Sequence, residues 1–467
     1  GILTGGGLGR AMANWIVDGL PDIDVTGIHV DRLHPYQAGA RYRATRTVES
    51  LGMVYQTHYP GRSMTTARGV KRSPLHDRLA ENGAHFRDVS GWEGADWYAP
   101  QGEVVDHELS WGRQPWFHLW EQEHHAVRQG VGLMDMAFMA KFLVQGPDAG
   151  RTLERISANR VDAEPGVITY TQWLNRAGLL EADLTVTKLD HDRFWVVASD
   201  TAHRHVQAWV RRHIGDDRTT ITDMTSAYAQ VNVQGPRSRE LLQSVTSVDL
   251  SNEAFGFRAA RQIDLGHAQV LCVRITYLGE LGYELYIPAE QAMHAYECLR
   301  EAGDPIGLRH VGLKALASLR MEKGYRDYGH DIDNTDSVLE AGLGFAVAMD
   351  KDFIGSDAVR RLADAGPLTR RLAQVRLLDP DPLMFHGEVV YRDGRMVGYV
   401  RAASYGHTLG GAVGLAMIDA GGIESGEPVT AAFIDSGRWE VDVAGVRYPA
   451  VASLKPMYDP TAARIKA

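Results

Sequence analysis

The segment that decides the fold reads Val273-Arg-Ile-Thr-Tyr-Leu-Gly-Glu-Leu-Gly-Tyr-Glu-Leu-Tyr286. Two runs of β-forming residues flank its two glycines, which predicts a bulge or tight turn inside an otherwise apolar strand. Tyr277, Glu280 and Glu284 are polar side chains in this buried-looking context. Each carboxylate needs a partner because burying it alone is costly. That partner could be an arginine, backbone N–H groups, or a ligand with a fork of donors, such as the 2-amino-4-oxopyrimidine ring of a pterin.

Upstream of this segment, the sequence predicts strands joined by tight turns. Residues Ile168–Leu174 and 184–189 have the pattern of strands, and 194–198 returns beside the second of them after a turn at 190–193. This places Asp183 at the mouth of a hairpin, immediately before a strand. From the local pattern alone, an aspartate there is most often a turn or edge residue. Downstream, residues 309–323 predict a helix ended by Gly324, with Arg320 and Glu322 partly buried in ion pairs or supporting a ligand pocket.

The first residues, Gly1-Ile-Leu-Thr-Gly-Gly-Gly-Leu-Gly9, predict a short apolar strand and a glycine turn, followed by an amphipathic helix that ends at Gly19. Such a unit brings backbone N–H groups close to a ligand. The glycine spacing is not that of a clean dinucleotide fingerprint, so a tight turn in an α/β domain is the plainer interpretation. Because the unit has no preceding sheet to join, we expect the chain to be the C-terminal part of a larger protein. Residues 34–100 are irregular and predict a small connecting domain.

The composition limits the possible functions. The 467 residues are 44% hydrophobic and 23% charged, which is typical of a soluble globular chain of several domains. A net charge of -10 argues against a nucleic-acid partner, because phosphate backbones attract concentrated Lys and Arg. No apolar run approaches the roughly 18 residues of a membrane helix. Two cysteines, Cys272 and Cys298, exclude a disulfide scaffold and fit a reducing compartment, where we expect both to pack as small apolar side chains.

One helix suggests a metal site at first sight. Residues 116–129 have helical periodicity, and Glu121-x-x-His124 has the spacing of a helix-borne carboxylate-bridged metal ligand pair, with His118 and His125 nearby. Such sites need a second copy on a partner helix, and the sequence has none. We therefore predict no metal here and interpret these residues as surface and boundary side chains.

A series of motifs in one order resembles the aminomethyltransferase fold of the glycine-cleavage T-protein. The resemblance runs from about residue 105 to the end of the chain. It implies an α+β fold, in which a ring-like, three-domain folate-binding module includes a C-terminal β-barrel domain. The motifs are Gly146-Pro147-Asp148, Tyr170 with Gly178 and Asp183, Val233-Gln-Gly-Pro236, Tyr277-Leu-Gly-Glu-Leu-Gly-Tyr-Glu284, Ser318-Leu-Arg-Met-Glu-Lys-Gly324, Glu340-Ala-Gly-Leu-Gly344, Phe353-Ile-Gly-Ser-Asp357, Val397-Gly-Tyr-Val400 and Pro456-Met-Tyr-Asp459.

Residues 1–100 resemble the corresponding part of the dimethylglycine oxidase, dimethylglycine dehydrogenase and sarcosine dehydrogenase family. That family oxidises an N-methyl amine with FAD and captures the resulting methylene on tetrahydrofolate as 5,10-methylenetetrahydrofolate. The resemblance implies four domains. Residues 1–33 would end the FAD-dependent oxidoreductase domain, 34–100 would form a connecting central domain, 101–370 the folate-binding aminomethyltransferase domain, and 371–467 the C-terminal β-barrel.

The same resemblance assigns roles to individual residues. Asp183 matches the family's catalytic aspartate beside the folate N10. Tyr277 and Glu284 match the pair that holds the pterin, and Tyr170 matches a tyrosine that lines the folate pocket. The residues that match the final flavin-domain loop, which meets FAD, are Leu3, Thr4 and Gly5. Two positions depart from the T-protein pattern: Leu316 replaces an arginine, as in the oxidase group, and the folate-tail arginine has only Arg447 as its nearest candidate.

The expected cofactors are tetrahydrofolate and FAD, the latter bound mainly by sequence outside this chain. The expected partners are a folate, an iminium derived from a small N-methyl amine, and an FAD-binding part that is fused or separate, with neither nucleic acid nor membrane. The expected location is the cytoplasm, or the mitochondrial matrix in a eukaryote. Two alternatives stay open, namely a folate-dependent O- or S-demethylase and a non-catalytic interaction module of the same fold.

Overall fold

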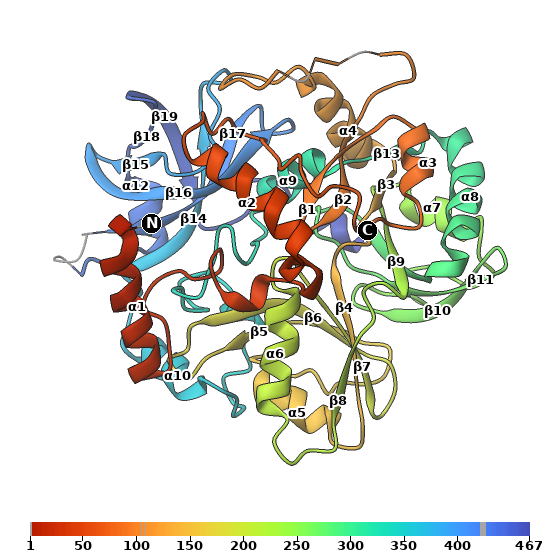
Figure 1. Ribbon diagram of the computed structural model, residues 1–467, viewed down its shortest axis with the longest axis horizontal. Coiled ribbons are helices and arrows are strands. Elements are labelled where there is room, and N and C mark those ends of the chain that lie inside the picture. Colours follow the sequence, from red (N-terminus) through yellow and green to blue (C-terminus); the bar gives the residue numbers. More distant parts are fainter. Residues whose placement is uncertain (1, 104, 107, 421–425) are drawn as a thin grey trace.

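The computed structural model describes residues 2–103, 105–106, 108–420 and 426–467. Within these ranges the strands form a two-stranded hairpin, a six-stranded sheet, a five-stranded sheet and a closed barrel (Figure 1). No helix in the described ranges is long and apolar enough to cross a membrane.

The six-stranded sheet has the order β10-β11-β12-β9-β3-β13. Val231, Val233 and Leu285 point to one face and pack into the core with helices α7 and α8, whereas the polar residues between them point to the other face. The bounds are β3 Gly132–Asp135, β9 Tyr228–Gln234, β10 Ala260–Leu265, β11 Ala268–Val273, β12 Gly282–Pro288, β13 Arg309–His310, α7 Ser238–Gln243 and α8 Ala292–Gly303.

The five-stranded sheet is antiparallel throughout, with the order β5-β6-β7-β4-β8. Trp173, Leu184 and Val196 bury its apolar face in the largest core of the described chain, together with helices α5 and α6. The alternation of these residues with polar ones is the period-2 pattern of a sheet with one buried face. The bounds are β4 Ala140–Gln145, β5 Ile168–Leu174, β6 Leu180–Lys188, β7 Arg193–Ala198, β8 Thr220–Asp223, α5 Ala149–Ile156 and α6 His203–His213.

The C-terminal part is a closed barrel with the order β14-β17-β16-β15-β18-β19, as the resemblance predicted. Closure leaves no free edge, so every strand pairs on both sides. The bounds are β14 Arg370–Leu377, β15 Val389–Arg392, β16 Arg395–Gly406, β17 Gly411–Asp419, β18 Trp439–Val443, β19 Val446–Ser453, and helix α12 Ala431–Ser436.

The N-terminal segment differs from the sequence prediction. Residues Ile2–Thr4 form a 3-10 turn (η1) rather than a strand, and the glycines continue into helix α1, Gly5–Asp18, rather than forming a turn. In the described chain no strand lies beside Ile2–Thr4 to pair with it, so helical bonding within the segment satisfies its backbone. Gly19 ends α1 with a φ of 77°, as predicted.

Residues 34–100 contain helix α2, Ala40–Val54, helix α3, His76–Glu81, and the hairpin of β1, Ala84–Val89, and β2, Trp92–Tyr98. The predicted helix at 116–129 is α4, Phe117–Gln129. The helix predicted from residue 309 begins later, as α9 Leu313–Glu322, because Arg309–His310 pairs with β3 instead. The remaining elements are α10 Ser356–Asp364, η2 Val30–Arg32, η3 Pro35–Ala38, η4 Ala289–Gln291, η5 Asp304–Ile306, η6 Gly344–Ala346 and η7 Arg464–Lys466.

Arg128 of α4 joins segments that are far apart in the sequence. Its guanidinium donates to Glu280 Oε1 at 3.0 Å and to Glu322 Oε2 at 2.9 Å, and it lies 3.8 Å from the ring centre of Tyr458. It also donates to the Leu278 carbonyl at 2.8 Å. The three charged side chains are at most 4% exposed. The predicted need of Glu280 for a partner is thus met, and the 274–281 segment, α9 and the C-terminus are held together.

We expect Arg128→Met to lower the free energy of unfolding by about 3–5 kcal/mol, because it removes the buried cation that Glu280 and Glu322 share. Glu280 keeps Arg464 and Tyr458, and Glu322 keeps His124 and two backbone N–H groups. Arg151→Met is the matched control, since Arg151 pairs with Asp217 but is 64% exposed, and its loss should cost less than about 1 kcal/mol. Denaturant unfolding measures both. Equal effects of the two substitutions would contradict a central role for Arg128.

Candidate functional site

Asp183 lies within strand β6, rather than before the strand as predicted, because β6 begins at Leu180. Its direct cross-strand neighbour on β5 is Gln172, whose Nε2 donates to Asp183 Oδ1 at 2.9 Å. Tyr170, two residues before Gln172, shares that face of the sheet and also hydrogen-bonds to Asp183. The hairpin register therefore brings the predicted catalytic aspartate and the predicted folate-lining tyrosine together.

The surroundings of Asp183 favour its neutral form. Burial raises the pKa of this carboxyl to about 7, the hydrogen bonds from Gln172 and Tyr170 lower it, and the carboxylates of Asp327 and Asp331 raise it. A carboxyl that titrates near neutral pH can both accept and donate a proton under physiological conditions.

Tyr277 lies in the irregular segment between β11 and β12, in electrostatic reach of Asp183. Its hydroxyl donates to the Arg326 carbonyl at 2.7 Å, and its ring stacks on Tyr325 with 6.0 Å between centres. The turn predicted around the two glycines explains this position, because Gly279 has a φ of 81° and lets the chain leave the sheet.

Glu284 lies on the polar face of the six-stranded sheet. Tyr286 donates to its Oε2 at 2.5 Å. Burial raises the pKa of Glu284, whereas Tyr286 and the ammonium of Lys141 lower it. Lys141 on β4 is fully buried, and this burial lowers its own pKa to about 7.

The polar faces of the two sheets face each other across this region. Trp195 of β7 is on the Asp183 side of its sheet, and its ring centre lies 5.6 Å from that of Tyr286, two residues after Glu284. Four buried polar atoms on these two sheet faces have no hydrogen-bond partner in the described ranges: Gln172 Oε1, Trp195 Nε1, Gln230 Oε1 and Gln234 Oε1. Buried polar groups are normally paired, so these atoms fit a polar ligand between the sheets, and a pterin offers matching donors and acceptors.

Sequence reasoning missed several residues of this site. Gln172 holds Asp183, and Asp327 and Asp331 influence its pKa. Arg326 lies in electrostatic reach of Tyr170, Asp183 and Tyr277 and donates to the Ala341 carbonyl at 2.9 Å. The sequence did hold a signal for Arg326, Asp327 and Asp331, because charged residues are dense at 325–331, directly after the glycine that ends α9.

Other predicted residues lie elsewhere. Leu3 is 97% exposed, and Thr4 and Gly5 are exposed at the start of α1, so these three residues do not by themselves enclose a flavin. Arg447 is exposed on β19, stacked on Tyr391 at 3.6 Å, and no contact joins it to Asp183.

The helix α4 histidines differ in part from their prediction as surface and boundary residues. His118 is exposed and bonds to Glu103 at 2.9 Å, but His124 is fully buried. Its ring nitrogens lie 2.6 Å from Ser318 Oγ and 2.8 Å from Thr408 Oγ1. Arg320 is ion-paired with Asp331 at 2.9 Å. These contacts give the buried side chains of His124 and Arg320 a structural role.

Comparison with known proteins identifies the fold and family. The GCVT N-terminal domain matches residues 75–351, and the glycine cleavage T-protein C-terminal barrel domain matches residues 370–459. The chain belongs to the glycine cleavage T-protein family. The aminomethyltransferase T of Bartonella henselae, from its crystal structure, shares the fold with a TM-score of 0.70 and 22% identity, over 84% of this chain and 99% of that one.

The predicted resemblance to the amine-oxidising group is confirmed as well. The FAD dependent oxidoreductase central domain matches residues 18–73. The 4-methylaminobutanoate oxidase (formaldehyde-forming) of Paenarthrobacter nicotinovorans is 39% identical, and the mitochondrial sarcosine dehydrogenase of Mus musculus is 30% identical. Each match covers 100% of this chain and 55% of the relative, so the chain spans about half the length of these relatives. The chain thus carries the domains of an aminomethyltransferase enzyme, and the relatives it matches are an amine oxidase and an amine dehydrogenase.

We expect Asp183→Asn to stabilise the folded chain above pH 7, by up to about 4 kcal/mol. The unfolded aspartate ionises near pH 4, whereas the folded one keeps its proton to about pH 7, so stability falls as the pH rises between these values. The asparagine variant lacks this loss, and the two proteins should be equally stable near pH 4. Denaturant unfolding from pH 4 to 8 measures the difference, with Asp192→Asn, in the turn after β6, controlling for the removal of one charge. A difference that does not change with pH would contradict the raised pKa.

Proposed function

We propose that this chain transfers a one-carbon unit to tetrahydrofolate, capturing the methylene released by oxidative demethylation of an N-methyl amine as 5,10-methylenetetrahydrofolate. The carrying observation is the placement of a carboxyl with a pKa near 7, Asp183, on a polar sheet face opposite the Glu284 carboxylate. The relatives named for 4-methylaminobutanoate and sarcosine support a carboxylated N-methyl amine of the dimethylglycine or sarcosine type as the source.

The proposed chemistry uses both ends of the site. Glu284 and Tyr277 would hold the pterin ring, and Tyr170 would line the path toward N10. The methylene arrives as an iminium or as formaldehyde, bonds to N5, and closes the ring at N10, with a proton leaving N10 as the new bond forms. With formaldehyde the second product is water, and with the iminium it is the demethylated amine. The ionised form of Asp183 would accept the N10 proton and stabilise the cationic intermediate, and its raised pKa suits the proton transfer.

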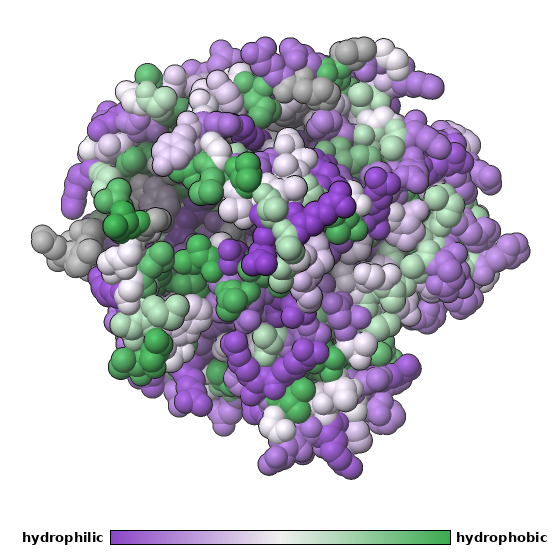
Figure 2. Space-filling model, viewed as in Figure 1, coloured by the Kyte–Doolittle hydropathy of each residue, from purple (hydrophilic) through white to green (hydrophobic). Residues whose placement is uncertain are grey.

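The surface supports the proposal that an FAD-bearing part, fused or separate, covers the N-terminal helices. Helix α1 exposes Leu8, Met12 and Ile16, and α2 exposes Val48 and Leu51. Figure 2 shows apolar side chains over these helices on one face. FAD would supply the oxidation of the amine, and the exposed residues Leu3, Thr4 and Gly5 would form only one edge of its site.

Two further proposals accompany this function. The domain boundaries lie at residues 33, 100 and 370. Two cysteines without a disulfide fit the cytoplasm or mitochondrial matrix. The alternatives, an O- or S-demethylase or a non-catalytic module of the same fold, are disfavoured by the FAD-dependent oxidoreductase match and by the joint presence of Asp183, Tyr277 and Glu284.

We expect Asp183→Asn to lower methylene transfer by about 10²–10⁴-fold while retaining folate binding, because it removes the proton acceptor but keeps the shape and the hydrogen bond to Gln172. The assay follows 5,10-methylenetetrahydrofolate formed from formaldehyde and tetrahydrofolate, above the spontaneous rate. Asp192→Asn is the control for altered charge. Transfer at the wild-type rate in Asp183→Asn would refute the role of this residue.

We expect Glu284→Gln to weaken tetrahydrofolate binding roughly tenfold or more, because a hydrogen bond to a charged group contributes about 1.5–3 kcal/mol. Transfer at saturating folate should change much less. Calorimetry gives the dissociation constant, and Glu290→Gln, exposed just after β12, is the matched control. An unchanged dissociation constant in Glu284→Gln, or equal weakening in both variants, would show that Glu284 does not hold the pterin.

A further inference from the structure

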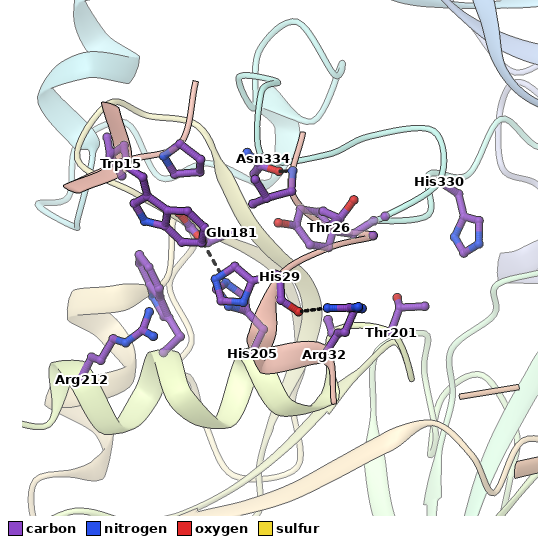
Figure 3. A pocket seen from close by; sticks show the side chains of 18 of the residues that line it. Trp15, Thr26, His29, Arg32, Glu181, Thr201, His205, Arg212, His330 and Asn334 are labelled. Carbon is purple, nitrogen blue, oxygen red and sulfur yellow. Dashed lines mark hydrogen bonds and ion pairs between the residues drawn. The ribbon is translucent and has the colours of Figure 1, made fainter. Parts of the chain in front are cut away.

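A second cluster of chemically active side chains lies where the N-terminal segment meets helix α6. It consists of His29, Asp31 and His205, each of which offers one ligand atom within 4.8 Å of the others. Asp31 Oδ2 is 3.7 Å from His29 Nδ1 and 3.9 Å from His205 Nδ1. Figure 3 shows the two imidazoles side by side near Trp15, and their ring centres are 5.2 Å apart.

The tautomer of His205 leaves a lone pair directed at this cluster. Its Nε2 lies 2.8 Å from Glu181 Oε2 (dashed in Figure 3). Because an ionised carboxylate can only accept, Nε2 carries the proton, and in the neutral imidazole Nδ1 then keeps the lone pair. His205 Nδ1 is buried and has no hydrogen-bond partner in the described ranges. An imidazole held at one nitrogen by a carboxylate, with a free lone pair at the other, is the arrangement found in metal-binding histidines.

The second histidine is held by the turn that carries Asp31. His29 precedes the 3-10 turn η2, and the Asp31 backbone N–H donates to His29 Nδ1 at 3.0 Å. This bond takes up the Nδ1 lone pair, so a metal ion bound at Nδ1 would have to replace the Asp31 N–H. The local turn places the His29 ring and the Asp31 carboxylate beside α6.

The spacing suits a small divalent ion. Ligand atoms bound tetrahedrally at about 2.0–2.2 Å lie about 3.4 Å from one another, a few tenths of an ångström less than the two observed distances. His29 and His205 also line a cavity of about 170 Å³, large enough for water to complete the coordination. The Arg212 guanidinium donates to Asp31 Oδ2 at 3.1 Å. The Arg212 side chain is 54% exposed, so it can turn into solvent when an ion binds Asp31.

We propose that His29, Asp31 and His205 bind one divalent transition-metal ion of the zinc class, oriented by Glu181 through His205. Two imidazoles and one carboxylate form a donor set that zinc and cobalt accept. The ion would fasten the segment after α1 to helix α6 of the T-protein module. The site does not depend on folate chemistry, so the metal proposal can fail while the proposed function holds, and the reverse.

The experiment titrates chelator-treated chain with Co²⁺, reading the visible d–d absorption, and with Zn²⁺ in competition. Asp31→Asn and His205→Gln each remove one ligand, and Glu181→Gln removes only the residue that orients His205. The control is His191→Gln, because Asp190, His191 and Asp192 form the other such cluster in the described chain, at a surface turn where His191 is 88% exposed. Limited proteolysis of residues 19–33 with and without Zn²⁺ tests the fastening.

We expect one equivalent of Co²⁺ with a low-symmetry spectrum in the wild type and in His191→Gln, and no such spectrum in either ligand variant. Glu181→Gln should bind roughly 10–100-fold more weakly. Zn²⁺ should slow proteolysis of residues 19–33 only where the site is intact. A wild type without d–d absorption, a spectrum unchanged in the ligand variants, or one lost in His191→Gln would overturn the proposal. Should a ligand variant fail to fold, unchanged affinity in Glu181→Gln would overturn it instead.

Discussion

The buried guanidinium of Arg128 is the interaction on which the rest of the structure depends. It neutralises Glu280 and Glu322, which lie on two different segments, and it holds the Leu278 carbonyl. Leu278 directly follows Tyr277, so the same contacts fix the segment that carries this tyrosine toward Arg326 and Asp183. Because unpaired buried charges are costly, the segments cannot separate without exposing or stranding these groups. The position of the candidate folate site therefore follows from a charge network outside it.

The sheets supply the second constraint. Each uses its apolar face to build a core with its own helices, and this leaves Asp183 and Glu284 on the opposite faces, which look toward each other. Burial then adjusts the acidity of each carboxyl. The same architecture explains why an aspartate in the middle of a strand is tolerated, since it lies on the side that a polar ligand would fill. The N-terminal segment contacts α6, the helix that packs on the five-stranded sheet, and His29 and His205 lie together there.

Much of this could be predicted from the sequence. The period-2 alternation revealed β5, β6 and β7, the helical spacing revealed α4, and the motif order revealed the barrel. The start of β6 was missed although Leu180, Glu181 and Ala182 continue the apolar–polar alternation, because an aspartate such as Asp183 is more typical of a turn than of a strand. The strand expected at Ile2–Thr4 was wrong because strand formation depends on a neighbour that local sequence cannot supply. Gln172, Asp327 and Asp331 were missed for a similar reason, since only the folded register and the loop after α9 bring them to Asp183. Roles for Tyr170, Asp183, Tyr277 and Glu284 stay predictions.

The most direct test of the central claim is a crystal structure of this chain with 5-formyltetrahydrofolate, a stable analogue of the proposed product. The account predicts the pterin ring between the two polar sheet faces, hydrogen-bonded to Glu284 and beside Tyr277. It also predicts N10 within hydrogen-bonding distance of Asp183, and partners for the buried atoms that now lack them near Trp195 and Gln230. A folate bound at another surface, or one whose N10 lies away from Asp183, would contradict the account.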